Sequence, residues 1–396
     1  MLRKIVSLIV ALSLTLLPAA LADDSFSMAN DGFSTSYTYN YDYWGDVQMS
    51  PDAYRVNTVI DSVSLGLDAL EGKRISRPQS LFVRGNALYI ADTGNNRILQ
   101  VRVEGESCTL VRIISEIRGS DRPTFNSPYD VYVDAEENIY VADYSNFRVV
   151  MVDRDLNWIK EFTKPLDATF SQELDFLPKK ITVDTSGRVY VQATNVNKGI
   201  VKYESDTTFT GYIGANKVSV SMADYIWKRY FMTKEQRAAS ASFVPTEYEN
   251  IYMDSEGFIY ATNTVFSEYD LKWDNAKPIR RLNAIGDDIL IKNDRYPPIG
   301  DLDWVEQSTD HGPSKFYDIT VLDNDMYIAI DRTRGRVFGY DPQGIMLWAF
   351  GMSGVSAEGA FNRAVSIEHM GTDLLVLDEL DCSITVFTAT DYGNLI

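Results

Sequence analysis

The sequence predicts an all-β fold, a six-bladed β-propeller of four-stranded antiparallel blades. Three observations lead to this prediction: a short motif recurs six times, residues alternate between apolar and polar within each copy, and turn residues separate the expected strands. The composition agrees, because 45% of the 396 residues are hydrophobic and 12% are aromatic, which supports a large ordered core.

The repeated motif is clearest in its first two copies, LYIAD from Leu88 and IYVAD from Ile139. Four looser copies follow, and one residue marks each of the six: Tyr89, Tyr140, Tyr190, Tyr260, Tyr327 and Leu375. These markers are 51, 50, 70, 67 and 48 residues apart, so the basic unit has about 50 residues and two copies are enlarged.

The second copy shows the content of one unit. Residues 128–134, 139–143, 148–153 and 158–163 each alternate as a half-buried strand does, with short turns between them. Four short antiparallel strands repeated six times are typical of a propeller, in which each sheet packs between its neighbours and only short edges remain. A linear solenoid is the alternative.

Closure of the ring is also predicted. The sixth copy ends after its third strand, residues 384–388. Residues 53–60 (AYRVNTVI) precede the first copy, have no partner there and are rich in strand-forming side chains. We expect this N-terminal strand to complete blade six.

Two segments carry a family resemblance. Residues 91–98 (ADTGNNRI) and 142–149 (ADYSNFRV) are close to the repeat motif of the NHL-repeat propellers, and the chain resembles exported NHL-repeat proteins of clostridial-type bacteria. It is more distantly similar to the YWTD-type and lactonase propellers. The fifth copy keeps Asp331 and Arg336 with one additional residue, and the sixth keeps Asp378. The resemblance implies the fold and no particular activity.

The motif residues have a structural explanation of their own. An Asp at a strand end accepts hydrogen bonds from loop amides, a Gly or Asn tolerates a left-handed turn, and an Arg lays its stem across the blade. We therefore assign a structural role, and no catalytic one, to Asp92, Asn95, Arg97, Asp143, Asn146 and Arg148.

The expected organisation is a propeller flanked by short segments: a signal peptide at 1–22, a Tyr-rich extended segment at 23–50, the propeller at 51–390 with insertions at about 215–244 and 287–315, and a stub at 391–396. The first insertion, between blades three and four, carries a helical pattern. The family resemblance implies that similar proteins continue into TPR-like repeats and a membrane anchor, which would make this chain a shortened version.

The first 22 residues predict export. Arg3 and Lys4 precede the apolar run 5–17, Pro18 ends it, and residues 20–22 (ALA) supply the small side chains that signal peptidase requires. We expect cleavage after Ala22 and a secreted or cell-surface protein. An uncleaved anchor is the alternative, although the apolar run is shorter than the roughly 20 residues that span a bilayer.

The segment that follows, residues 23–50, places aromatic side chains at every second position: Tyr37, Tyr39, Tyr41 and Tyr43, with Trp44 beside them. Such spacing predicts extended backbone with its aromatic side in contact with the propeller. Contact with a ligand or partner is the alternative.

Charge and residue counts exclude several function classes. The chain carries 37 Lys and Arg against 56 Asp and Glu, a net charge of −19, which disfavours nucleic acid as a partner.

Two cysteines, Cys108 and Cys382, are too few for a disulfide framework or a thiolate zinc site. They fall in the neighbouring blades one and six, where we expect buried free thiols, with a closing disulfide as the alternative. His311 and His369 have no partner histidines.

Equivalent positions in the first strand of each copy predict a ring around the central channel. These positions hold Ser80, Asp130, Lys180, Asn250, Asp318 and Ser366, and the preceding positions hold Gln79, Tyr129, Lys179, Glu249, Tyr317 and Val365. Polar groups therefore gather where the channel should open, on the rim that the two insertions enlarge. The insertions add Trp227 and Trp304, which either seat the insertions on the blades or stack on a ligand.

These residues favour an exported, non-catalytic propeller that binds a polar small molecule, a glycan or a protein, without a cofactor. The candidate ligand-binding residues are Asp130, Lys180, Asn250, Asp318, Glu249, Tyr129, Tyr317, Trp227 and Trp304. The lactonase resemblance implies an alternative, a metal-dependent lactone or ester hydrolase with Ca²⁺ or another divalent cation held by Glu249, Asn250, Asp130 and Asp318. Gln79 stands where such enzymes carry a Glu, and Lys179 and Lys180 oppose a metal. A purely structural envelope module is the third alternative.

Overall fold

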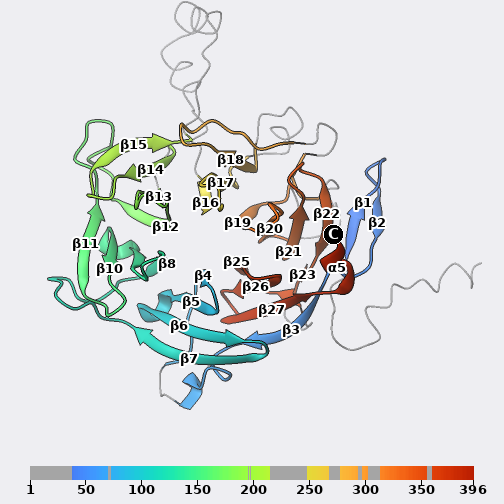
Figure 1. The fold of residues 1–396 in the computed structure, drawn as a ribbon, viewed down its shortest axis with the longest axis horizontal. Helices are drawn as coiled ribbons and strands as arrows, with labels where there is room; N and C mark the ends of the chain where they lie inside the picture. Colours follow the sequence, from blue (N-terminus) through green and yellow to red (C-terminus); the bar gives the residue numbers. More distant parts are fainter. Residues whose placement is uncertain are drawn as a thin grey trace, which may run out of the picture.

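The protein is a six-bladed β-propeller, as predicted (Figure 1). The computed structural model describes residues 38–69, 73–194, 196, 198–214, 248–266, 277–292, 297–301, 313–354 and 359–396. The predicted signal peptide, the helical pattern of the first insertion, Trp227, Trp304 and His311 lie outside these residues. Among the described residues, no helix has the length and apolar character needed to cross a membrane.

The first three blades each have four antiparallel strands in sequence order from the channel outward. Their bounds are β4 (Ser80–Arg84), β5 (Ala87–Asp92), β6 (Arg97–Glu104) and β7 (Ser107–Ile114); β8 (Pro128–Val133), β9 (Ile139–Asp143), β10 (Arg148–Val152) and β11 (Trp158–Thr163); and β12 (Leu177–Val183), β13 (Val189–Thr194), β14 (Ile200–Tyr203) and β15 (Phe209–Ile213).

Blade five follows the same plan, blade four shows three strands among the described residues, and blade six takes its fourth strand from the N-terminal side of the propeller. Their strands are β16 (Tyr248–Met253), β17 (Ile259–Asn263) and β18 (Ile279–Leu282); β19 (Phe316–Val321), β20 (Tyr327–Asp331), β21 (Arg336–Tyr340) and β22 (Met346–Phe350); and β25 (Ala364–Met370), β26 (Asp373–Asp378) and β27 (Ser383–Ala389). Between blades five and six lies a small parallel pair, β23 (Met352–Ser353) and β24 (Ala360–Phe361).

Short helices lie at turns and at the end of the chain: the 3-10 helices η1 (Leu67–Ala69), η2 (Thr93–Asn95) and η3 (Tyr144–Asn146), and α5 (Asp391–Leu395). Thr390 caps α5, because its side chain accepts a hydrogen bond from the Gly393 amide at 3.1 Å.

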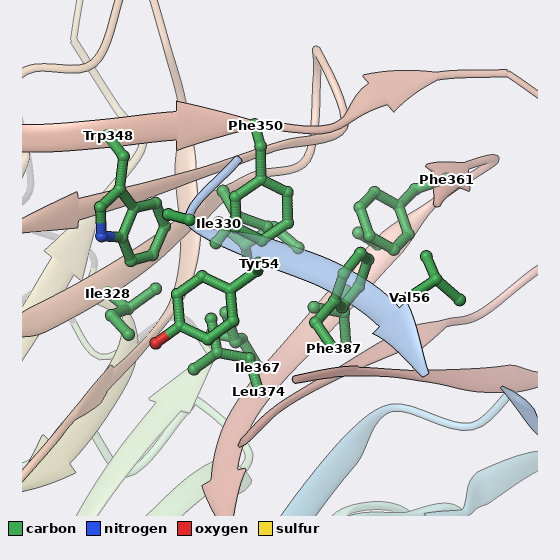
Figure 2. Packing of buried hydrophobic residues seen from close by; sticks show 14 of the residues in the cluster. Tyr54, Val56, Ile328, Ile330, Trp348, Phe350, Phe361, Ile367, Leu374 and Phe387 are labelled. Carbon is green, nitrogen blue, oxygen red and sulfur yellow. The ribbon is translucent and has the colours of Figure 1, made fainter. Parts of the chain in front are cut away.

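The ring closes through the N-terminal strand, as predicted. β3 (Tyr54–Ile60) pairs antiparallel with β27 as the fourth strand of blade six, and the two lie side by side in Figure 1. Its side chains also join blades five and six: the Tyr54 ring lies 5.0 Å from Trp348 and 5.7 Å from Phe350, and Val56 packs in the same cluster near Phe387 (Figure 2). The closing strand is therefore part of the core.

The described part of the Tyr-rich segment, residues 38–50, is a hairpin. β1 (Tyr39–Tyr41) pairs with β2 (Val47–Met49) and with the outer strand β22, which extends blade five. Tyr39 is buried, whereas Tyr43 and Trp44 at the hairpin turn are 64% and 75% exposed. Only part of the aromatic row therefore faces the propeller.

The repeated Asp anchors the loop that enters its own blade. Asp143 accepts hydrogen bonds from the Asn126 amide at 2.7 Å and from Asn146 at 2.8 Å, and it pairs with Arg148 Nε at 2.9 Å. Blade one repeats the arrangement, with Arg97 Nε 2.6 Å from Asp92. Arg148 and Asp143 are both fully buried.

Details of this motif differ from the prediction. The left-handed residue is Asn96 in blade one and Phe147 in blade two, with φ of 54° and 60°. Gly94 is needed for a different reason: the backbone of Ser76 passes so close that a Cβ at position 94 would lie 2.5 Å from the Ser76 carbonyl oxygen.

In blade five the arginine that pairs with Asp331 is Arg334, at 3.2 Å. The expected partner, Arg336, lies instead 3.6 Å from Asp301, outside the repeat. The additional residue expected in this copy is not there, because Asp331 and Arg336 are five positions apart, as are Asp92 and Arg97. Arg334 stands three positions after the Asp, where the first two copies have an Asn that bonds to the carboxylate, and the arginine takes over that contact.

Cys108 and Cys382 are free, and both are half-buried rather than buried. They pack at the edge of the same apolar cluster between blades one and six. The closing disulfide does not form in this structure.

We predict that Tyr54→Ala destabilises the fold by about 3 to 5 kcal/mol, the usual cost of removing a large buried aromatic side chain. Chemical denaturation measures the change. The matched control is Tyr43→Ala at the exposed hairpin turn, which should cost less than about 0.5 kcal/mol. Equal effects of the two substitutions would show that the closing strand does not contribute to the core.

A second prediction concerns the buried ion pair. Arg148→Leu should cost about 3 to 5 kcal/mol, because it leaves the Asp143 carboxylate buried without its cation. Arg154→Leu is the control, since Arg154 lies 3.7 Å from Glu137 and both side chains are about two-thirds exposed; we expect at most about 1 kcal/mol. A similar small change at Arg148 would contradict the proposed structural role.

Candidate functional site

A β-bulge in the innermost strand aims the ring residues at the channel. The pairing of first and second strands shifts register immediately before the ring residue in five blades, between Pro128 and Asp130 in blade two and at the equivalent places in blades three to six. A bulge adds a residue to one strand and re-aims its side chains. Consecutive residues such as Lys179 and Lys180 can therefore both serve the channel.

The six ring residues lie deeper than the mouth, where they form a polar layer across the channel. All six are buried. Lys180 Nζ lies 3.0 Å from Ser80 Oγ, 3.8 Å from Asp318 Oδ2 and 3.9 Å from Asp130 Oδ1. Ser80 Oγ in turn donates to Asp130 Oδ1 at 2.5 Å. We call these residues, Ser80, Asp130, Lys180, Asn250, Asp318 and Ser366, the plug.

The plug also joins the innermost strands of neighbouring blades through backbone amides at three junctions. Asp130 accepts a hydrogen bond from the Ile181 amide of blade three at 2.8 Å, and Asp318 accepts one from the Ile367 amide of blade six at 3.0 Å. Ser366 Oγ accepts one from the Leu81 amide of blade one at 3.1 Å. These amides lie on the unpaired edge of the innermost strands, so the plug satisfies buried donors.

The electrostatics of the plug follow from one cation between two carboxylates. Burial raises the pKa of Asp130 and of Asp318, and the Lys180 ammonium opposes that rise. Burial acts to lower the pKa of Lys180, but Asp318 and Asp130 raise it by more, so that the ammonium stays charged. With all three ionised the layer carries one net negative charge.

A cavity of about 350 Å³ lies on one side of the plug. Its floor includes Ser80, Asp130, Lys180, Asn250 and Asp318. Its outer end reaches Met253 and Met370, the last residues of two innermost strands, and Gly85 and Gly371 in the turns that follow such strands. We call it the channel pocket. It lies at the opposite end of the channel from the insertions, which precede the innermost strands, and so differs from the predicted position of the site.

The wall of the channel pocket is a second ring, two residues beyond the plug in each strand. It holds Phe82, Tyr132, Thr182, Tyr252, Thr320 and Glu368, of which all but Thr320 line the cavity directly. Phe82 and Tyr132 lie with ring centroids 4.8 Å apart. The sequence analysis missed this ring. The signal was available, because alternation along a strand returns every second side chain to the same side.

One side of this wall gathers an acid, a hydroxyl and an imidazole. Thr320 Oγ1 lies 3.3 Å from Glu368 Oε2 and 2.8 Å from His369 Nδ1. Burial raises the pKa of Glu368 well above its usual value, and the nearby Asp318 raises it further. Burial lowers the pKa of His369. Both groups are therefore held toward their neutral forms.

A second cavity, of about 340 Å³, lies at the insertion end of the channel. It is lined by polar or amphipathic side chains from blades one, two, three, five and six: Gln79, Tyr129, Tyr144, Lys179, Thr194, Tyr317, Arg332, Arg363 and Glu379. We call it the upper mouth. It shares no lining residue with the channel pocket. The candidates Tyr129 and Tyr317 lie here, and Glu249 is bonded to Lys179 beside it.

The four residues of the metal alternative do not converge on one position. Lys180 lies between Asp130 and Asp318, Glu249 is paired with Lys179, and Asn250 Oδ1 accepts from the Ile251 amide at 2.5 Å. Within the described ranges, no group of three or more His, Cys, Asp or Glu side chains is arranged to hold a metal ion. This donor set does not fit a divalent cation.

The chain is only distantly similar to known proteins. No family model and no curated protein matches the chain, so the resemblance to NHL-repeat proteins stays a prediction. Among solved structures, a Bacteroides thetaiotaomicron protein of unknown function is 12% identical, with 90% of each chain covered and a TM-score of 0.49. An inactive Staphylococcus aureus virginiamycin B lyase with quinupristin is also 12% identical, over 91% of this chain and 97% of that one, with a TM-score of 0.47. A putative gluconolactonase is 10% identical, over 86% and 93%, with a TM-score of 0.47. At these values none of them bears on function.

Proposed function

We propose that this protein is an exported, non-catalytic propeller that binds a small neutral polyhydroxylated molecule, of the carbohydrate class, in the channel pocket. One observation carries the proposal: a cavity with a hydrogen-bonding floor and an aromatic wall. Its volume of about 350 Å³ falls in the range of small-molecule sites.

The lining residues suit a sugar-like ligand. Phe82, Tyr132 and Tyr252 offer aromatic surface for the apolar face of a ring, while Asp130 and Asn250 offer acceptors and donors for hydroxyl groups. An anion would meet the net negative charge of the plug. A neutral ligand with many hydroxyls fits better.

Glu368 adds a directed contact. Its raised pKa favours the neutral acid, which can donate one hydrogen bond as well as accept others. Tyr252, whose pKa is also raised by burial and by Glu368, stays a neutral phenol beside it. This side of the pocket therefore supplies donors that complement the acceptors of the floor.

Binding is a better account of these residues than metal-dependent hydrolysis. The Lys180 ammonium lies between the two carboxylates that a cation would need. Export is proposed from the N-terminal pattern of basic, apolar and small residues.

We predict that residues 23–396 bind a neutral mono- or disaccharide in a glycan-array screen followed by calorimetry, and that Phe82→Ala weakens this binding by about tenfold or more. The matched control is Phe209→Ala, which removes a half-buried ring from the outer strand of blade three. Absence of any neutral saccharide ligand, or unchanged affinity of the Phe82 variant, would contradict the proposal.

A pH prediction follows from Glu368. Its folded-state pKa is raised above the unfolded value of about 4.3, so its contribution to stability is complete below that pH and is lost as pH rises through the folded-state pKa. Glu368→Gln mimics the neutral acid. The free energy of unfolding of the variant should therefore rise relative to that of the wild type as pH rises from the unfolded-state pKa to the folded-state pKa of Glu368. The expected rise is up to about 1.4 kcal/mol per pH unit.

Thermal unfolding between mildly acidic and mildly alkaline pH measures this difference. Asp318, Lys180, His369 and Tyr252 are the other titratable groups around Glu368, and both proteins contain them. Exposed Glu106→Gln is the control and should show no comparable trend. A pH-independent difference for Glu368→Gln would show that the residue is ionised in the folded protein.

A further inference from the structure

We infer that the upper mouth is a second binding site, specific for the carboxylate of a small polar molecule. The inference is independent of the proposed function, because the plug separates the upper mouth from the channel pocket. It rests on the charges, the donors and the volume of the upper mouth.

Three cations from three blades reach this cavity: Lys179 from blade three, Arg332 from blade five and Arg363 from blade six. Two carboxylates accompany them. Glu249 is bonded to Lys179, and Glu379 lies 3.3 Å from Arg363 Nη1. Among the described residues, the local balance is one positive charge, in a chain whose net charge is −19. A cavity of opposite sign to the rest of the protein attracts a complementary ion.

Arg332 supplies the surplus charge. Its guanidinium lies 4.5 Å from the centre of the Tyr317 ring, and no carboxylate within the described ranges is paired with it. Stacking on an aromatic face leaves the edge of a guanidinium, with its N–H donors, available to a ligand. A planar carboxylate accepts two such bonds side by side.

Tyr317 and Lys179 hold this arrangement in place. Lys179 Nζ lies 4.9 Å from the same Tyr317 ring, so one ring contacts two cations. Burial acts to lower the pKa of Lys179, but Tyr317 and Glu249 raise it by more. The lysine therefore stays charged at the floor of the upper mouth.

The remaining lining residues define the rest of the ligand. Tyr129 and Tyr144 lie with ring centroids 4.6 Å apart, and Gln79 and Thr194 add uncharged polar groups. These groups suit hydroxyls on the body of the ligand. One surplus positive charge matches a monoanion, whereas a phosphate dianion would remain partly uncompensated. The geometry therefore points to a monocarboxylate with hydroxyl groups.

The probes are D-glucuronate and D-galacturonate, with their neutral methyl esters and inorganic phosphate as comparisons, measured by calorimetry on residues 23–396. We expect at least one uronate to bind, the esters to bind at least tenfold more weakly, and phosphate to compete poorly. Binding should also weaken as salt concentration rises. No uronate binding at millimolar concentration, equal binding of the esters, or stronger binding of phosphate would overturn the inference.

Arg332→Gln tests the residue assignment and should weaken uronate binding by roughly ten- to a hundredfold. The matched control is Arg154→Gln on the outer surface of blade two, which should leave the affinity unchanged. Thermal unfolding shows whether each variant folds, and Arg363→Gln replaces Arg332→Gln if the latter does not. Unchanged affinity in a folded variant would contradict the site.

The two sites can be told apart in the same experiment. Phe82→Ala should leave uronate binding unchanged, and Arg332→Gln should leave neutral saccharide binding unchanged. Loss of uronate binding in the Phe82 variant would place the carboxylate in the channel pocket and overturn this second site.

Discussion

The central constraint on this propeller is the unpaired edge of each innermost strand. A strand inside a sheet bonds to neighbours on both sides, but the first strand of each blade has a neighbour on one side only, and its other edge faces the channel. Buried backbone amides on that edge need acceptors. Asp130, Asp318 and Ser366 supply them for the next blade, so the polar residues at the axis are required by the fold before any ligand is considered.

This requirement has an electrostatic consequence. Carboxylates buried at the axis need a compensating charge, and Lys180 provides it at 3.8 and 3.9 Å. The resulting plug divides the channel into two cavities with different chemistry. Below it, acidic and aromatic groups face a pocket whose wall includes Glu368, and burial raises the pKa of that carboxyl. Above it, Lys179 and two arginines face a mouth with surplus positive charge.

The sequence predicted the parts of this structure that depend on periodicity. The six blades and the closing strand β3 follow from repeats and alternation, and the same alignment found the six plug residues. It did not reveal that these residues lie inside the channel below its mouth, because a bulge depends on how two strands pair and has no characteristic residue pattern in the sequence. The second ring was missed because Phe82, Thr182 and Glu368 differ in chemical type. They share only their position, two residues beyond the plug in each strand. The partner of Asp331 was wrong because Arg334 replaces the Asn that stands three positions after the Asp in the first two copies, and it pairs with the carboxylate from there.

The bulge also explains how one strand can serve two sites. In a regular strand, consecutive side chains point to opposite faces, so adjacent residues would not both reach the channel. The extra residue before the plug breaks this alternation in five blades. In blade three it gives Lys179 to the upper mouth and Lys180 to the floor of the channel pocket. A substitution at Lys179 therefore changes the charge of the upper mouth while the backbone amides that the plug satisfies stay paired. Lys180 is more constrained, because it also neutralises the buried carboxylates of Asp130 and Asp318. The upper mouth can thus change its ligand chemistry without disturbing the plug.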